Sequence, residues 1–177
     1  MKIGFIGLGL MGRGIAANLQ KAGHVIVVHD LVRQAASQHL QNGATWAETP
    51  RSVAEASDVV FTSLPTPGDV ETVAAGERGL AAGFRKGAAW FDLSTNSVDV
   101  VRRLHATLAA QGVEFLDAPV SGGPIPVEQL TISPVDDRQP GPPGIPIQVL
   151  GLHVIPQNPM HFNAIDIKRP VVDLLKH

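Results

Sequence analysis

Short apolar runs alternate with amphipathic stretches over the first two thirds of the chain. The runs are compact and bounded by turn residues. They show no regular polar alternation, which is typical of strands in a parallel sheet covered on both faces. Five strands are predicted, over residues 3–6, 25–29, 59–63, 89–93 and 114–117.

Helices are predicted between the strands because apolar residues recur there at intervals of three and four. The pattern is carried by Met11, Ile15 and Leu19 in one segment and by Val101, Leu104 and Leu108 in another. Asn96 or Ser97 is placed to cap the start of the second helix. A weaker helical pattern covers 31–42, and a further helix is predicted from about Pro50. This alternation predicts an α/β fold of the Rossmann type, a doubly wound parallel sheet.

The character of the chain changes after Gly123. Of its 14 prolines, 10 lie from Pro124 onward, where they remove backbone donors and exclude a long helix. Only short strands near 147–149 and 152–155, and at most two turns of helix over 170–176, are predicted there. We therefore divide the chain into a dinucleotide-binding Rossmann domain over 1–123 and an irregular, Pro-rich tail over 124–177.

The first predicted strand leads directly into Gly7-Leu8-Gly9-Leu10-Met11-Gly12, which opens a predicted helix. In that context the Gly-x-Gly-x-x-Gly spacing indicates a loop that cradles the pyrophosphate of NAD or NADP. Gly7 permits a tight turn, Gly9 has no Cβ to obstruct the pyrophosphate, and Gly12 lets the helix pack closely on the strand. Free N–H groups and the positive end of the helix dipole then meet the phosphates. The alternative is an ordinary glycine-rich turn.

Asp30 ends the second predicted strand, 18 residues beyond Gly12. An acidic group near this offset accepts hydrogen bonds from the adenosine ribose and repels a 2′-phosphate, which favours NAD. Arg33 lies three residues on and is placed to neutralise such a phosphate, so NADP stays open. A solvated strand end is the alternative interpretation of Asp30.

Three other predicted strands run into segments rich in proline, hydroxyl groups or glycine, at 63–67, 92–97 and 117–123. Ligands bind at the carboxyl ends of the strands in open α/β sheets. The hydroxyl of Ser121 and the bare amides of Gly122 and Gly123 suit a substrate carboxylate. From residue chemistry alone, turn and capping roles explain these segments equally well.

Together these segments resemble the β-hydroxyacid dehydrogenase family, which includes 3-hydroxyisobutyrate dehydrogenase and is related to 6-phosphogluconate dehydrogenase. The matching motifs, in the family's order and spacing, are 3–12, the Leu64-Pro65 pair, 92–95 and 117–123. The resemblance implies that the glycine loop, Leu64, Pro65 and Thr95 contact NAD or NADP. It also implies that Ser121, Gly122 and Gly123 hold a 3-hydroxy carboxylate, the substrate of an oxidoreductase acting on its CH–OH group. Full-length relatives are expected to be homo-oligomers.

The family's catalytic lysine and helical domain have no counterpart in the tail. Lys168 lies near the expected sequence distance, but no Gly-rich run precedes it and Pro170 follows two residues later. We therefore expect no catalytic residue in this chain, and turnover that is very slow or absent. A frameshift or truncation after Gly123 explains the tail, as does a short variant with its own C-terminal segment. A non-catalytic NAD(P)-binding module or remnant, and an unstable fragment, are the alternative functions.

The composition of the chain argues against several classes of binding partner. The net charge is -2 and the pI is near 6.4, which argues against a nucleic-acid binder. The chain has no cysteine, and its histidines lack ligand spacing, so no metal site is predicted. No segment approaches about 18 uninterrupted apolar residues and no signal-peptide pattern is found, so we expect a cytoplasmic protein without a membrane partner.

Overall fold

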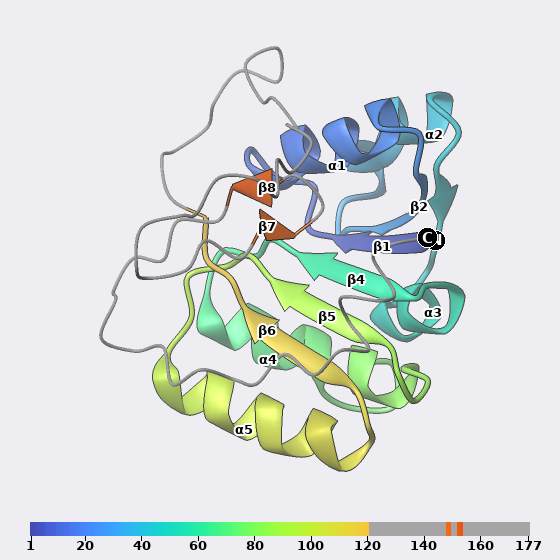
Figure 1. The fold of residues 1–177 in the computed structure, drawn as a ribbon. Helices are drawn as coiled ribbons and strands as arrows, with labels where there is room; N and C mark the ends of the chain where they lie inside the picture. The colour runs from blue at the N-terminus through green and yellow to red at the C-terminus, as the bar shows by residue number, and fades with distance from the viewer. Residues whose placement is uncertain (121–147, 150–151, 154–177) are drawn as a thin grey trace, which may run out of the picture.

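Six parallel strands form one sheet in the order β3-β2-β1-β4-β5-β6 (Figure 1). This computed structural model describes residues 1–120, 148–149 and 152–153. The predicted doubly wound parallel sheet is confirmed. Its strands are β1 (Lys2–Ile6), β2 (Val25–His29), β3 (Thr45–Trp46), β4 (Val59–Thr62), β5 (Ala89–Asp92) and β6 (Glu114–Asp117).

The apolar runs form strands because both of their faces are buried. Every residue of β4 and β5 is buried. On one face of the sheet Phe5, Phe61 and Phe91 share a register across β1, β4 and β5. Their ring centroids lie 6.4 Å and 5.2 Å apart in consecutive pairs. Such aromatic contacts between neighbouring strands stabilise the sheet centre beyond the area that they bury.

Helices cover both faces of the sheet (Figure 1). The helices are α1 (Gly12–Lys21), α2 (Ser37–Gln41), α3 (Pro50–Ala56), α4 (Pro67–Ala74) and α5 (Val98–Ala110). Ile15 and Leu19 of α1 lie in the same hydrophobic cluster as Phe5. Val53 of α3 and Leu108 of α5 belong to the cluster on the opposite face. The helical spacing of apolar residues therefore predicts the buried faces of α1 and α5 correctly.

The helices α3, α4 and α5 begin with a side-chain cap. Thr49 accepts a hydrogen bond from the Ser52 amide at 3.0 Å, and Thr66 forms a reciprocal capping box with Asp69. Ser97 accepts from the Val100 amide, so it is the cap of α5 rather than Asn96. Each cap satisfies a backbone donor that has no partner within the helix.

The region between β2 and β3 differs from the helix predicted over 31–42. It forms a short 3-10 helix over Arg33–Ala36, followed by α2. One Asp30 carboxylate oxygen accepts the Val32 amide at 2.8 Å, and Val32 itself is extended. This local turn delays the start of the helix, because Asp side chains compete for backbone donors. The strand β3 was not predicted, since it is only two residues long.

Beyond residue 120 the structure describes one antiparallel pair, β7 (Gln148–Val149) with β8 (Leu152–His153). These strands lie within the two segments predicted as short strands. Our predictions for Ser121, Gly122, Gly123 and Lys168, and for a helix over 170–176, fall outside the described residues.

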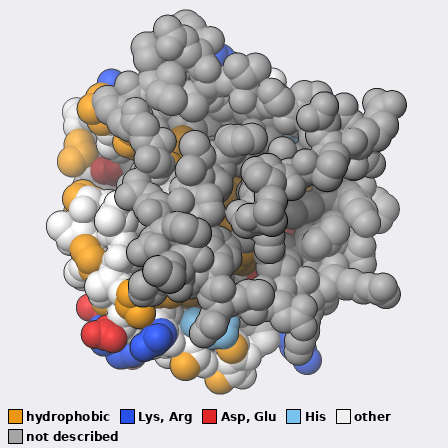
Figure 2. Space-filling view, turned by 60° about the vertical axis from the view of Figure 1, so that its left-hand side comes forward, with side chains coloured by type: hydrophobic (Ala, Val, Ile, Leu, Met, Phe, Trp, Pro, Cys, Tyr) orange, Lys and Arg blue, Asp and Glu red, His pale blue; other side chains and the backbone are white. Residues whose placement is uncertain are grey.

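Charged side chains of both signs occur close together on the face shown in Figure 2. The described residues form four exposed ion pairs, which are Arg33–Glu48, Arg51–Glu55, Arg85–Asp58 and Arg103–Glu71. Exposed pairs of this kind contribute little to stability. None of the described helices has the length and hydrophobicity needed to cross a membrane.

Candidate dinucleotide-binding site

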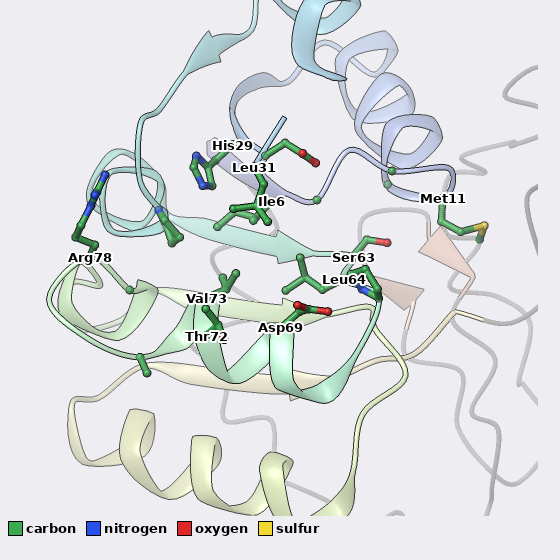
Figure 3. A pocket seen from close by; sticks show the side chains of 18 of the residues that line it. Ile6, Met11, His29, Leu31, Ser63, Leu64, Asp69, Thr72, Val73 and Arg78 are labelled. Carbon is green, nitrogen blue, oxygen red and sulfur yellow. The ribbon is translucent and has the colours of Figure 1, made fainter. Parts of the chain in front are cut away.

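The strand order reverses direction between β1 and β4. The chain passes from β1 outward to β2 and β3, then returns to the other side of β1 to form β4. A crevice forms at such a switch point because the loops after the two strands lead away in opposite directions. A cleft of about 540 Å³ lies there, bordered by the glycine loop, the end of β2, the loop after β4, and α4 (Figure 3).

The three glycines of the loop have different surroundings. Gly7 has a φ of 91°, and a Cβ there would lie 2.2 Å from the Ser63 carbonyl oxygen. A Cβ on Gly12 would lie 1.8 Å from the carbonyl oxygen of Gly7. By contrast, a Cβ on Gly9 would meet no atom of the described residues within 4 Å. Gly7 and Gly12 therefore permit close packing of the loop, while Gly9 borders open space.

The N-terminus of α1 carries no side-chain cap. Met11 occupies the cap position without a hydrogen bond from its side chain, and the first turn has no acidic residue. The backbone N–H groups of Leu10 and Met11 donate no hydrogen bond to any acceptor among the described residues. A helix start with free N–H groups and an unopposed dipole favours a bound anion.

Asp30 links the glycine loop to the end of β2. One oxygen of its carboxylate accepts the Leu8 amide at 2.7 Å, and the other accepts the Val32 amide at 2.8 Å. Each oxygen of an ionised carboxylate can accept a second hydrogen bond. Asp30 also lines the cleft. The carboxylate therefore holds the loop in place and keeps acceptor capacity for a ligand, and the first of these roles was not expected from the sequence.

Arg33 is directed toward β3. Its guanidinium lies 3.2 Å from the Glu48 carboxylate and 5.4 Å from the centroid of the Trp46 ring. It is not among the residues that line the cleft. In this position Arg33 is engaged by Glu48 and Trp46 rather than presented to a phosphate at Asp30.

The structure brings most of the predicted cofactor residues together. Gly7, Gly9, Leu10, Met11, Gly12, Asp30, Leu64 and Pro65 all line the cleft. Two predicted residues do not. The Leu8 side chain is buried in the hydrophobic cluster beside α1, and its amide donates to Asp30, which lines the cleft. Thr95 is exposed on the loop after β5, beyond the border of the cleft.

Several cleft residues were missed by sequence reasoning. They come from the end of β2, the start of α3 and the α4 region, and include His29, Leu31, Pro50, Thr72, Val73 and Arg78 (Figure 3). The imidazole Nδ1 of His29 lies 2.8 Å from the Ala47 carbonyl oxygen, whereas Leu31 is 97% exposed. For the α4 residues, the sequence does contain a local signal. The segment Thr66-Pro67-Gly68-Asp69 is a capping pattern that predicts the start of α4.

A buried carboxylate lies behind the loops that follow β4 and β5. Asp92 is fully buried. One of its oxygens accepts the hydroxyls of Thr62 at 2.7 Å and Ser94 at 2.6 Å, and the other accepts the Asn96 amide group at 3.0 Å. Burial raises the pKa of Asp92, and these hydrogen bonds oppose the rise. We call Asp92, Thr62, Ser94 and Asn96 the Asp92 network.

Asp117 ends β6 directly opposite Asp92 in the register of the two strands. Its side chain keeps contact with solvent. Partial removal from water, followed by the negative charge of Asp92, raises the pKa of Asp117 to about 6. Two neighbouring carboxylates therefore stand at the carboxyl end of the sheet, one buried and one open to water.

The geometry and the comparisons agree on the class of protein. Residues 2–134 match the family model described as the NAD binding domain of 6-phosphogluconate dehydrogenase. The chain belongs to this family, and the predicted membership of the β-hydroxyacid dehydrogenases is confirmed. Its cofactor class is therefore NAD or NADP, as predicted.

Individual relatives show how much of a longer protein this chain matches. The chain is 41% identical over 123 residues to 2-(hydroxymethyl)glutarate dehydrogenase of Eubacterium barkeri, covering 70% of this chain and 41% of that protein. The structure of Mycobacterium tuberculosis 3-hydroxyisobutyrate dehydrogenase with L-serine aligns with a TM-score of 0.63 and 37% identity, covering 72% of this chain and 42% of that one. Psf3 in complex with NADP+ and 2-OPP aligns with a TM-score of 0.66 and 35% identity, covering 71% and 44%. The chain thus spans less than half the length of these relatives.

Proposed function

We propose that the chain binds NAD or NADP in the cleft at the switch point, with the pyrophosphate over Gly9. The open space at Gly9 beside the uncapped start of α1 carries this proposal. Amides that lack an acceptor there are placed to donate to phosphate oxygens. Residues 1–123 form the dinucleotide-binding unit in this proposal, and the tail is not required.

The adenosine half of the cofactor occupies the part of the cleft between Asp30 and α4. The free acceptor capacity of Asp30 receives the ribose hydroxyls, while Leu64 and Val73 offer apolar surface to the adenine. A 2′-phosphate placed at Asp30 is repelled, and Arg33 is already paired with Glu48. We therefore expect NAD to bind more tightly than NADP.

The nicotinamide half extends toward Thr95, and a 3-hydroxy carboxylate is held by Ser121, Gly122 and Gly123. Relatives named for dehydrogenation of hydroxy acids support this substrate class. When bound, the cofactor supplies the hydride acceptor of an alcohol oxidation. The chain's part is to orient the dinucleotide and the carboxylate. We place this activity in the cytoplasm.

A non-catalytic NAD(P)-binding module is the second candidate. It is favoured by the sequence around Lys168, which lacks the Gly-rich run that precedes the family's lysine. Both candidates bind the cofactor, and they differ in turnover. We expect oxidation of 3-hydroxyisobutyrate by this chain to be very slow or absent, whereas a rate typical of enzymes would reject the module in favour of a dehydrogenase.

Calorimetric titration of the purified chain with NADH and NADPH tests cofactor binding. We expect saturable binding of both, with the stronger affinity for NADH. A Gly9→Ala variant should bind at least about tenfold more weakly, because a methyl group then occupies the open space next to the loop. Absence of binding to the folded parent chain would contradict the proposal.

A further inference from the structure

The Ser94 hydroxyl connects a buried charge to a wall of the cleft. It donates to the Asp92 carboxylate at 2.6 Å and accepts the Leu64 amide at 2.9 Å. Ser94 itself is only 3% exposed and does not line the cleft. Leu64 and Pro65, by contrast, border the cleft directly. The carboxyl end of β5 is thus coupled to a surface that faces the adenosine half of the site.

Asp92 determines the direction of these hydrogen bonds. An ionised carboxylate only accepts, so both hydroxyls that contact it must donate their single proton to it. Their lone pairs then remain free to accept. Ser94 accepts the Leu64 amide, and Thr62 accepts the indole N–H of Trp90 at 2.9 Å. Without the carboxylate, either hydroxyl is free to rotate away from its donor.

We propose that Ser94, oriented by Asp92, is a positioning residue that holds the Leu64-Pro65 wall against the adenosine half of the cofactor. This role rests on the proposed dinucleotide binding but assigns no contact between Ser94 and the cofactor. The Leu64 amide is partly buried, and loss of its acceptor leaves a donor without a partner. The loop after β4 then relaxes toward other acceptors and changes the shape of the cleft.

Binding of ADP-ribose separates this role from contacts made by the nicotinamide. We expect Ser94→Ala to weaken ADP-ribose binding about five- to tenfold in calorimetry, the range that loss of one hydrogen bond produces. Ser97→Ala is the matched control, since it removes the cap of α5 but has no bond to Leu64. It should change ADP-ribose affinity by less than about twofold, although it also lowers stability. Equal affinities for the parent and Ser94→Ala would overturn the positioning role.

Amide hydrogen exchange in the unmodified chain provides an independent measurement if Ser94→Ala does not fold. After correction for intrinsic rates, the Leu64 amide should exchange at least about tenfold more slowly than the Leu10 amide. Comparable rates for the two amides would reject the wall contact. If the parent chain fails to bind ADP-ribose while Leu64 is protected, the proposed function fails and the wall contact stands.

Discussion

The two halves of the sheet's carboxyl edge are built in opposite ways. After β1 the site is formed by glycines, which have no side chains. The backbone makes close contacts at Gly7 and Gly12, and no described atom lies near a Cβ built at Gly9. After β4 and β5 the loops are held by buried polar side chains gathered around Asp92. The first half leaves backbone N–H groups without an acceptor among the described residues. In the second half, the donors form hydrogen bonds with other groups of the protein.

This contrast agrees with the pyrophosphate contact that we propose for the first half. A pyrophosphate needs several N–H groups at close range, which side chains would obstruct. Loops without such a ligand need internal partners for their polar groups, because a buried donor or acceptor left alone is costly. Helix starts show the same division, since α1 is uncapped whereas α4 and α5 carry Thr66 and Ser97.

The largest effect is expected from Gly12→Ala. The added methyl would lie 1.8 Å from the Gly7 carbonyl oxygen, so the backbone of the loop must move. We expect the free energy of unfolding to fall by about 3 kcal/mol and cofactor binding to be lost. Urea unfolding measures the first effect and calorimetry the second. Gly9→Ala is the control, because it should leave the free energy of unfolding within about 1 kcal/mol. Equal destabilisation by both variants would remove the distinction between the glycines.

Asp92→Asn tests the other half of the edge. The amide oxygen can still accept from Thr62 and Ser94, but the amide nitrogen would face the donor group of Asn96. We expect a loss of about 1–2 kcal/mol in the free energy of unfolding, measured in urea. Adding Asn96→Asp restores a donor opposite an acceptor and should recover part of this loss. Further destabilisation by the second change would contradict the assigned direction of the bonds.

Asp117→Asn is expected to give a smaller effect that depends on pH. The pKa of Asp117 is raised from 3.8 to about 6, so the folded chain retains a proton that the unfolded chain releases. Stability from this group therefore falls as pH rises from about 4 to about 6. The variant should be more stable than the parent above pH 6, by less than about 1 kcal/mol because solvent screens the exposed carboxylate. The difference should vanish near pH 4, and a difference independent of pH would argue against titration of Asp117.

Arg33→Ala is expected to have the smallest effect. It removes an exposed ion pair with Glu48 and a contact with the Trp46 ring. The free energy of unfolding should fall by less than about 1 kcal/mol, which is measured as a small decrease in melting temperature. NADPH affinity should change by less than about twofold, because Arg33 is paired with Glu48 and does not line the cleft. A selective loss of NADPH affinity would show that Arg33 leaves Glu48 to contact the 2′-phosphate.

Local patterns predicted the strands and the glycine loop well. The residues that carry them are neighbours in sequence, so the apolar run of 25–29 and the spacing from Gly7 to Gly12 contain the information. The pattern failed at β3, which is too short to show periodicity, and near Asp30, whose side chain competes for a backbone donor. Thr66 and Asp69 form a capping pattern that marks the start of α4, and it too is a local signal in the sequence.

What the sequence by itself determined is the sheet, the family and the position of the glycine loop, because each rests on residues close together in the chain. Only the tertiary structure decided that Asp30 holds the Leu8 amide and that Ser94 holds Leu64. These contacts join residues 22 and 30 positions apart. They exist because parallel strands bring their carboxyl ends to one edge, where register decides which groups meet.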